Sequence, residues 1–169
     1  MVRDFPLDPE LEDEVLKLVG QITVAFTALD YVLRLYVKSL LSAGFDVGMA
    51  VAAQHRYMPA LCDLVFSLYK LKVEDEKAVK RFDKLLSDAL TLSRRRNDLM
   101  HSFWTVDPDT DEVVLIKPTA EKGKGLRHGG GPVKVGELRR FLRSVSELAH
   151  KLDEHRTREL PGLLKPNVE

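Results

Sequence analysis

A short stretch near the middle of the chain gathers side chains that suit chemistry on a phosphate group. It reads RRRNDLMHSFW over residues 94–104. Arg96 offers a cation for a phosphate, Asn97 an amide that can position it, and His101 an imidazole that titrates near neutral pH. A lone histidine would carry little weight, but these residue types within six positions favour a phosphate-handling site.

The stretch ends a helix that we expect from about residue 74 to residue 101 or 103, because apolar residues recur there at helical spacing. At about 100° per residue, Arg96 falls near the middle of the apolar face, whereas Asn97 and His101 share its border. A cation on a core face is costly unless it is paired. We predict Asp30, at the edge of the apolar stripe of the first helix, as the partner of Arg96. A purely structural ion pair is the alternative interpretation.

Three further segments show helical spacing. The first runs from Pro9 to about residue 41, with Asp8 as its N-cap, and the last from about Val135 to Glu159, where Pro161 and Gly162 end it. The segment 47–71 contains Pro59 and should form two shorter pieces, because proline removes a backbone donor. Short connections between these helices predict an all-α fold, an antiparallel bundle of four main helices.

An insertion at about residues 104–134 interrupts the helical pattern before the last helix. The segments FWTV at 103–106 and VVLI at 113–116 flank the turn-rich DPDTDE and predict a β-hairpin. Glu112 and Pro118 occupy the positions where a calcium loop needs glycine and glutamate, which argues against calcium. The glycine-rich segment EKGKGLRHGGGP should be a mobile loop. Its basic residues either attract RNA phosphates or belong to a solvated loop. The candidate RNA-binding residues are Arg94, Arg95, Lys122, Lys124 and Arg127.

The composition is that of one globular domain, which we place at residues 1–169. Apolar residues make up 44% and charged residues 31%, and the formal net charge is zero, so anion binding requires a local patch. Cys62 lies in an apolar pattern and suits the core. No histidine and cysteine spacing suggests a metal site, and we expect no cofactor. The N-terminus is acidic and no apolar run approaches the length of a membrane span, so we expect a cytoplasmic protein without membrane contact.

The residues 96–101 resemble the signature of HEPN domains (higher eukaryotes and prokaryotes nucleotide-binding), in which a histidine follows an arginine and a polar residue. The resemblance extends to the helical bundle, to the motif near the end of a late helix and to the acid in AFTALD, residues 25–30. It covers most of the chain and leaves the insertion outside the common core.

The resemblance implies metal-independent RNA cleavage by a homodimer, often as a toxin or defence effector, with an antitoxin protein as a further partner. Arg96 would then stabilise the scissile phosphate, Asn97 would orient it and His101 would transfer protons. Asp30 would position Arg96. Some HEPN proteins carry a modified tyrosine two places after the histidine, but this chain has Phe103 there. That modification is excluded.

The chemistry also favours a dimer. RNA cleavage through the 2′-hydroxyl needs a base and an acid, and two copies of His101 would supply both. Two other interpretations remain open. One is a non-catalytic HEPN module that binds a nucleotide, RNA or a protein, and the other is a structural helical bundle in which Arg96 is merely ion-paired.

Overall fold

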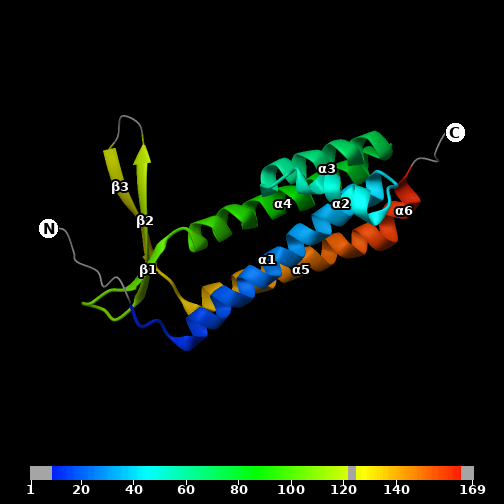
Figure 1. Ribbon diagram of the computed structural model, residues 1–169. Coiled ribbons are helices and arrows are strands. Elements are labelled where there is room, and N and C mark those ends of the chain that lie inside the picture. Colours follow the sequence, from blue (N-terminus) through cyan, green and yellow to red (C-terminus); the bar gives the residue numbers. More distant parts are fainter. Residues whose placement is uncertain (1–8, 122–124, 165–169) are drawn as a thin grey trace. The chain divides into compact units, whose positions relative to one another are not determined.

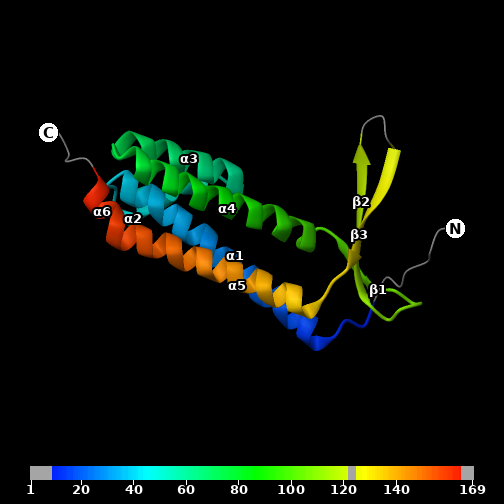
Figure 2. The same ribbon diagram turned by 180° about the vertical axis from the view of Figure 1, so that it is seen from behind.

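The computed structural model describes residues 9–121 and 125–164 and is mostly helical, with a small antiparallel sheet (Figures 1 and 2). This confirms the predicted predominance of helices. The elements in chain order are α1 (Asp13–Leu40), α2 (Phe45–Ala53), α3 (Met58–Lys72), α4 (Glu76–Met100), β1 (Phe103–Val106), β2 (Val113–Glu121), β3 (Gly125–Pro132), α5 (Val135–Glu154), the π-helical turn η1 (His155–Glu159) and α6 (Leu160–Leu163).

The helix boundaries follow local chemistry. Helix α1 begins at Asp13, later than the predicted Pro9, with the acids Asp13 and Glu14 in its first turn. The predicted N-cap, Asp8, lies outside the described residues. The segment predicted as two pieces is indeed split into α2 and α3. Pro59 lies in the first turn of α3 and does not break a helix, because a proline there loses no intrahelical hydrogen bond.

Helix α1 is long and apolar enough to cross a membrane by length and composition alone. The expectation that no apolar run reaches that length is therefore wrong. Its outer face carries uncharged residues such as Val24 and Ala28 where most surface helices carry charges. The opposite face packs as in a core helix, with Leu29 and Leu33 fully buried.

The chain divides into two compact units, and both include parts of α1, α4 and α5. One comprises the chain up to Thr23 and Arg94–Arg143, and it holds the sheet together with the RNDLMH motif. The other comprises Val24–Ser93 and the chain from Ser144 onward. Its core contains fully buried side chains from several helices, among them Leu33, Leu61, Phe82, Leu152 and Leu160.

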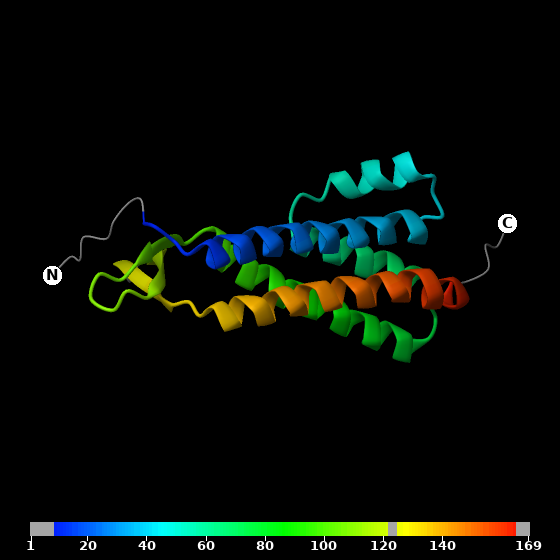
Figure 3. The same ribbon diagram turned by 90° about the horizontal axis from the view of Figure 1, so that it is seen from below.

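In the second unit, α2 lies alongside the later part of α1 (Figure 3). A side chain at Gly48 would begin 2.5 Å from the Cβ atom of Lys38, so this close approach needs glycine. Arg34 of α1 also donates to the carbonyl oxygen of Ala52 at 2.9 Å, near the C-terminal end of α2. These two contacts fix α2 against α1.

The sheet has the order β1-β2-β3 with antiparallel pairs. The hairpin of β1 and β2 confirms the predicted strands, and Asp107 and Asp111 close its turn with a backbone hydrogen bond of 2.8 Å. The predicted mobile loop is wrong for residues 125–132, which form β3. Gly130 has a φ of 139°, and a Cβ atom there would lie 1.8 Å from the carbonyl oxygen of Leu115. Gly130 therefore permits the close pairing of β3 with β2 at this position.

The last helix also differs from the prediction. Helix α5 ends at Glu154, but the chain continues through the π-helical turn η1 into the short helix α6. Pro161 does not stop the helical path, because it occupies the first turn of α6, where its missing N–H costs no hydrogen bond.

Candidate functional site

The predicted site residues lie at the C-terminal end of α4 and in the turn that follows. The N–H group of His101 donates to the carbonyl oxygen of Asn97 at 3.0 Å, which continues the helical pattern one residue beyond Met100. Both side chains are exposed. Because four residues separate them, they lie on the same side of the helix end, as predicted.

Arg96 occupies the boundary between the apolar face and solvent. Its side chain is half-buried, and its Nη1 atom donates to Oδ1 of Asn97 at 3.3 Å. The Nε atom is buried and has no hydrogen-bond partner. The apolar stem therefore lies on the core face while the guanidinium reaches outward to Asn97. An unpaired buried N–H costs about 1 to 3 kcal/mol, so this position of the Arg96 side chain has a cost for the fold.

Asp30 has a different partner from the predicted Arg96. Its carboxylate pairs with Arg34 one turn along α1, with 2.6 Å between Nε and Oδ2. The i,i+4 spacing makes this pair available without any tertiary contact. Arg34 in turn holds the end of α2, as described above. Asp30 thus orients Arg34, and its observed role is to support the α1–α2 contact.

The candidate RNA-binding cations differ in their surroundings. Arg94 is exposed. Arg95 lies over the ring of Phe141 at 5.1 Å and within 3.9 Å of Glu137, so part of its charge is used on α5. Lys122 and Lys124 lie outside the described residues. The backbone of Arg127 pairs with Thr119 in the sheet, and its side chain lies outside the description.

The structure brings Arg96 and Asn97 together but keeps His101 apart from Arg96. Five residues separate them, which places their side chains about 140° apart around the helix. One protomer thus presents the imidazole of His101 and the amide of Asn97 on the same exposed side, while the guanidinium of Arg96 contacts Asn97 and not His101. Among residues 9–121 and 125–164, no cluster of three or more His, Cys, Asp or Glu side chains could hold a metal ion.

A cavity of about 350 Å³ lies on a neighbouring side of the same helix end. Residues of α4, β2, β3 and α5 line it, including Asp98, Leu99 and Lys117. Asp98 and Lys117 form an ion pair at its edge. This cavity was not predicted from the sequence. Strand β3 forms part of its wall, and residues 125–132 were expected to be a mobile loop instead of a strand.

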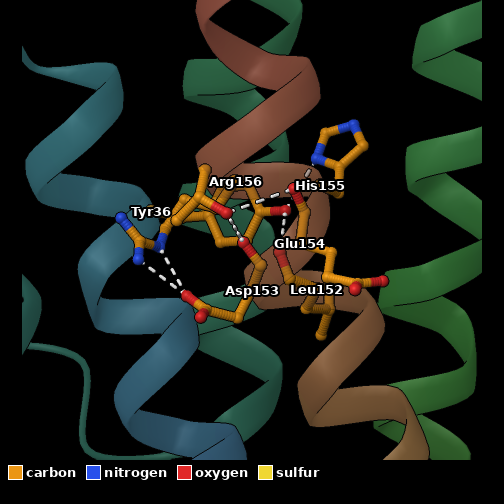
Figure 4. A network of polar contacts seen from close by, with 7 residues as sticks. Tyr36, Leu152, Asp153, Glu154, His155 and Arg156 are labelled. Atoms are coloured by element: carbon orange, nitrogen blue, oxygen red, sulfur yellow. Dashed lines mark hydrogen bonds and ion pairs between the residues drawn. The ribbon is translucent and has the colours of Figure 1, made fainter.

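A buried polar network in the second unit was also missed (Figure 4). The hydroxyl of Tyr36 donates to the carbonyl oxygen of Leu152 at 2.9 Å and lies 2.7 Å from Nδ1 of His155. The hydroxyl of Tyr69 lies 3.3 Å from Nε2 of the same ring. Phe82 stacks on both the Tyr69 and the His155 rings, at 4.0 and 5.2 Å between centroids.

These contacts assign the protons of the network. With the Tyr36 hydroxyl donating to Leu152, the consistent assignment has its oxygen accept from Nδ1–H of His155 and has Nε2 accept from Tyr69. Burial lowers the pKa of His155 below its ordinary value of 6.5, which favours this neutral ring. Burial also raises the pKa of Tyr69 to about 12, so its hydroxyl keeps its proton.

The network gave one signal in the sequence. Tyr36 and Tyr69 lie on apolar helix faces, and a buried tyrosine hydroxyl needs a hydrogen-bond partner.

Comparisons with known proteins do not identify the site. No family model matches this chain, and no curated protein or solved structure matches it.

Proposed function

We propose that this chain is a metal-independent endoribonuclease of the HEPN kind that cleaves RNA at a composite site in a homodimer. The observation that carries the proposal is the shared exposed side of Asn97 and His101, with the guanidinium of Arg96 drawn toward Asn97 at 3.3 Å. This places an amide and an imidazole where an RNA backbone can reach them, next to a cation whose Nε atom lacks a partner.

The proposed reaction needs two proton transfers and charge stabilisation. His101 of one protomer takes the proton of the 2′-hydroxyl, whose oxygen attacks the adjacent phosphorus. The bond to the 5′-oxygen breaks, and that oxygen takes a proton from His101 of the partner subunit. Arg96 and Asn97 stabilise the charge on the phosphate. The products are a 2′,3′-cyclic phosphate and a free 5′-hydroxyl.

The homodimer follows from the same reasoning. A single protomer presents one imidazole at this place, so a general base and a general acid need two copies. We propose that a two-fold axis passes beside the end of α4, because an isologous interface brings each motif to its copy. We further propose that the main helices form the antiparallel four-helix bundle expected of HEPN domains, with the sheet as an insertion.

The biological setting stays a proposal drawn from the resemblance. We propose a toxin or defence effector that acts in the cytoplasm without membrane contact and is controlled by an antitoxin protein. A non-catalytic module that binds RNA, a nucleotide or a protein is the second candidate. The separation of His101 from Arg96, about 140° around the helix, favours this module, because one protomer does not bring the imidazole and the guanidinium to the same phosphate.

The test is RNA cleavage by the purified protein in EDTA, beside His101→Ala and a matched His150→Ala control. His150 is also exposed, and it belongs to α5 and not to the motif. We expect the wild type and His150→Ala to produce fragments ending in a cyclic phosphate, and His101→Ala to produce none. Cleavage that His101→Ala retains would contradict the proposal, and absence of cleavage by any of the three would favour the module.

A further inference from the structure

The cavity beside the motif has the construction of a small-ligand site. Its volume of about 350 Å³ lies within the range of roughly 300 to 1,000 Å³ that is usual for such sites. Leu99, Leu115 and Leu138 give it an apolar lining that suits the faces of a flat ring. All of its lining residues belong to the unit that holds the motif.

The edge of the cavity offers a paired acceptor and donor. The carboxylate of Asp98 accepts from the ammonium group of Lys117, and these side chains are 56% and 42% exposed. An ion pair that is this exposed stabilises the fold little, so a ligand can take its place at small cost. Ser102 donates to the backbone carbonyl oxygen of Asp98 at 2.5 Å and not to its carboxylate.

A glycine keeps the wall of the cavity open. Gly131 of β3 lines it, and a Cβ atom added there would meet no atom within 4 Å. The neighbouring Gly130 is different, because a Cβ atom there would collide with the carbonyl oxygen of Leu115. A larger residue at position 131 would therefore fill the cavity without disturbing the strand pairing.

We propose that this cavity binds a guanine base, with the carboxylate of Asp98 and the ammonium group of Lys117 reading its Watson–Crick edge. Guanine presents two adjacent donors, N1–H and the 2-amino group, beside one acceptor, O6. A carboxylate matches the two donors, and an ammonium group matches the acceptor. Adenine would turn its N1 acceptor toward the carboxylate, and cytosine and uracil do not present two adjacent donors.

The position of the cavity links this base to the proposed reaction. Asp98 directly follows Asn97, so their Cα atoms are about 3.8 Å apart and their side chains about 100° apart around the helix. A nucleotide whose base lies against Asp98 can extend its sugar and phosphate toward Asn97 and His101. Only this link to RNA cleavage rests on the proposed function. The recognition of guanine does not, since a free guanine nucleotide offers the same base as RNA.

Titration calorimetry with the full chain tests base recognition independently of RNA cleavage. We expect GMP to bind more tightly than IMP, which lacks the 2-amino group, and AMP to bind most weakly. Loss of one hydrogen bond to a charged group corresponds to about tenfold or more in affinity. Equal affinities for the three nucleotides, or no binding of GMP at millimolar concentration, would overturn the proposal.

Two variants locate the binding. Gly131→Val should abolish GMP binding, whereas Gly20→Val, at another glycine with open space around it, should bind as the wild type does. Asp98→Asn should weaken binding about tenfold or more, beside an Asp88→Asn control elsewhere on α4. GMP affinity that Gly131→Val or Asp98→Asn retains would show that the base binds elsewhere and would refute the assignment.

Mapping of RNA cleavage sites separates the two possible sources of the base. Guanine beside every cleaved bond would identify RNA as the source. Cleavage without base preference would overturn the link to RNA while the ribonuclease proposal stands. GMP binding by a protein that does not cleave RNA would support the guanine site and refute the ribonuclease proposal.

Discussion

Replacement of Tyr36 by phenylalanine should destabilise the protein, because the hydroxyl of Tyr36 joins two other buried groups. The side chain of Tyr36 is 0% exposed and that of His155 is 8% exposed, so water cannot easily replace the lost contacts. In Tyr36→Phe, the Nδ1–H group of His155 loses its acceptor at 2.7 Å and the carbonyl oxygen of Leu152 loses a donor at 2.9 Å. The ring itself keeps its packing against Phe82.

The expected loss in the free energy of unfolding is about 2 to 4 kcal/mol. Each buried polar group that loses its partner costs about 1 to 3 kcal/mol. Phenylalanine has no hydroxyl to desolvate on folding, which offsets part of this loss. Urea unfolding followed by circular dichroism measures the change, provided that the slope with urea stays constant. Tyr31→Phe is the matched control, because Tyr31 lies on the same helix and is 44% exposed.

The control should change stability by less than about 0.5 kcal/mol, as surface substitutions usually do. Equal stabilities of Tyr36→Phe and Tyr31→Phe would refute the network. Nitrogen-15 NMR of the histidine rings gives a second reading, since the proton of His155 should lie on Nδ1. A proton on Nε2 of the neutral ring would contradict the assigned chain of donors and acceptors.

Two further predictions concern pH and the glycine strand. The pKa of His155 is lowered by burial, so the unfolded chain binds a proton more readily; stability should be full above about pH 6.5 and fall as the pH drops from there toward the lowered pKa. Urea midpoints between pH 8 and 5 should show this fall in the wild type, and an equally steep fall in His155→Phe would assign it to other groups. Gly130→Ala should lower the free energy of unfolding by about 1 to 3 kcal/mol because of the positive φ alone, and the clash with the carbonyl oxygen of Leu115 should add to this loss. Faster amide hydrogen exchange in β2 would report it, and unchanged exchange, as expected for Gly131→Ala, would contradict it.

The sequence predicted the long helices well because their apolar spacing is a local property. Helix α4 ends at Met100, near the predicted end, and Asn97 and His101 share a side because helical geometry alone sets their relation. The split near Pro59 also followed from local chemistry. The start of α1 and the end of the last helix were less accurate, because the first and last turns depend on contacts that a periodic pattern does not contain.

Features that depend on tertiary contacts were missed. Strand β3 forms because glycine allows a close approach to β2, whereas the same glycines in the sequence are typical of a flexible loop. Two arginines were candidate partners of Asp30, and we predicted Arg96, but the structure pairs Asp30 with Arg34, one turn away on the same helix. The cavity beside the motif is lined by α4 and by strands that come later in the chain, so no single motif could have predicted it.

The central claim is that two copies of His101 act together in one dimer, and subunit mixing tests it most directly. Wild-type protein and His101→Ala are mixed in equal amounts, allowed to exchange subunits, and assayed for RNA cleavage in EDTA at constant total concentration. If base and acid come from different protomers, only wild-type dimers cleave, and the mixture should retain about a quarter of the wild-type activity. Activity near a half would show that each protomer carries a complete site of its own, and would contradict the composite site.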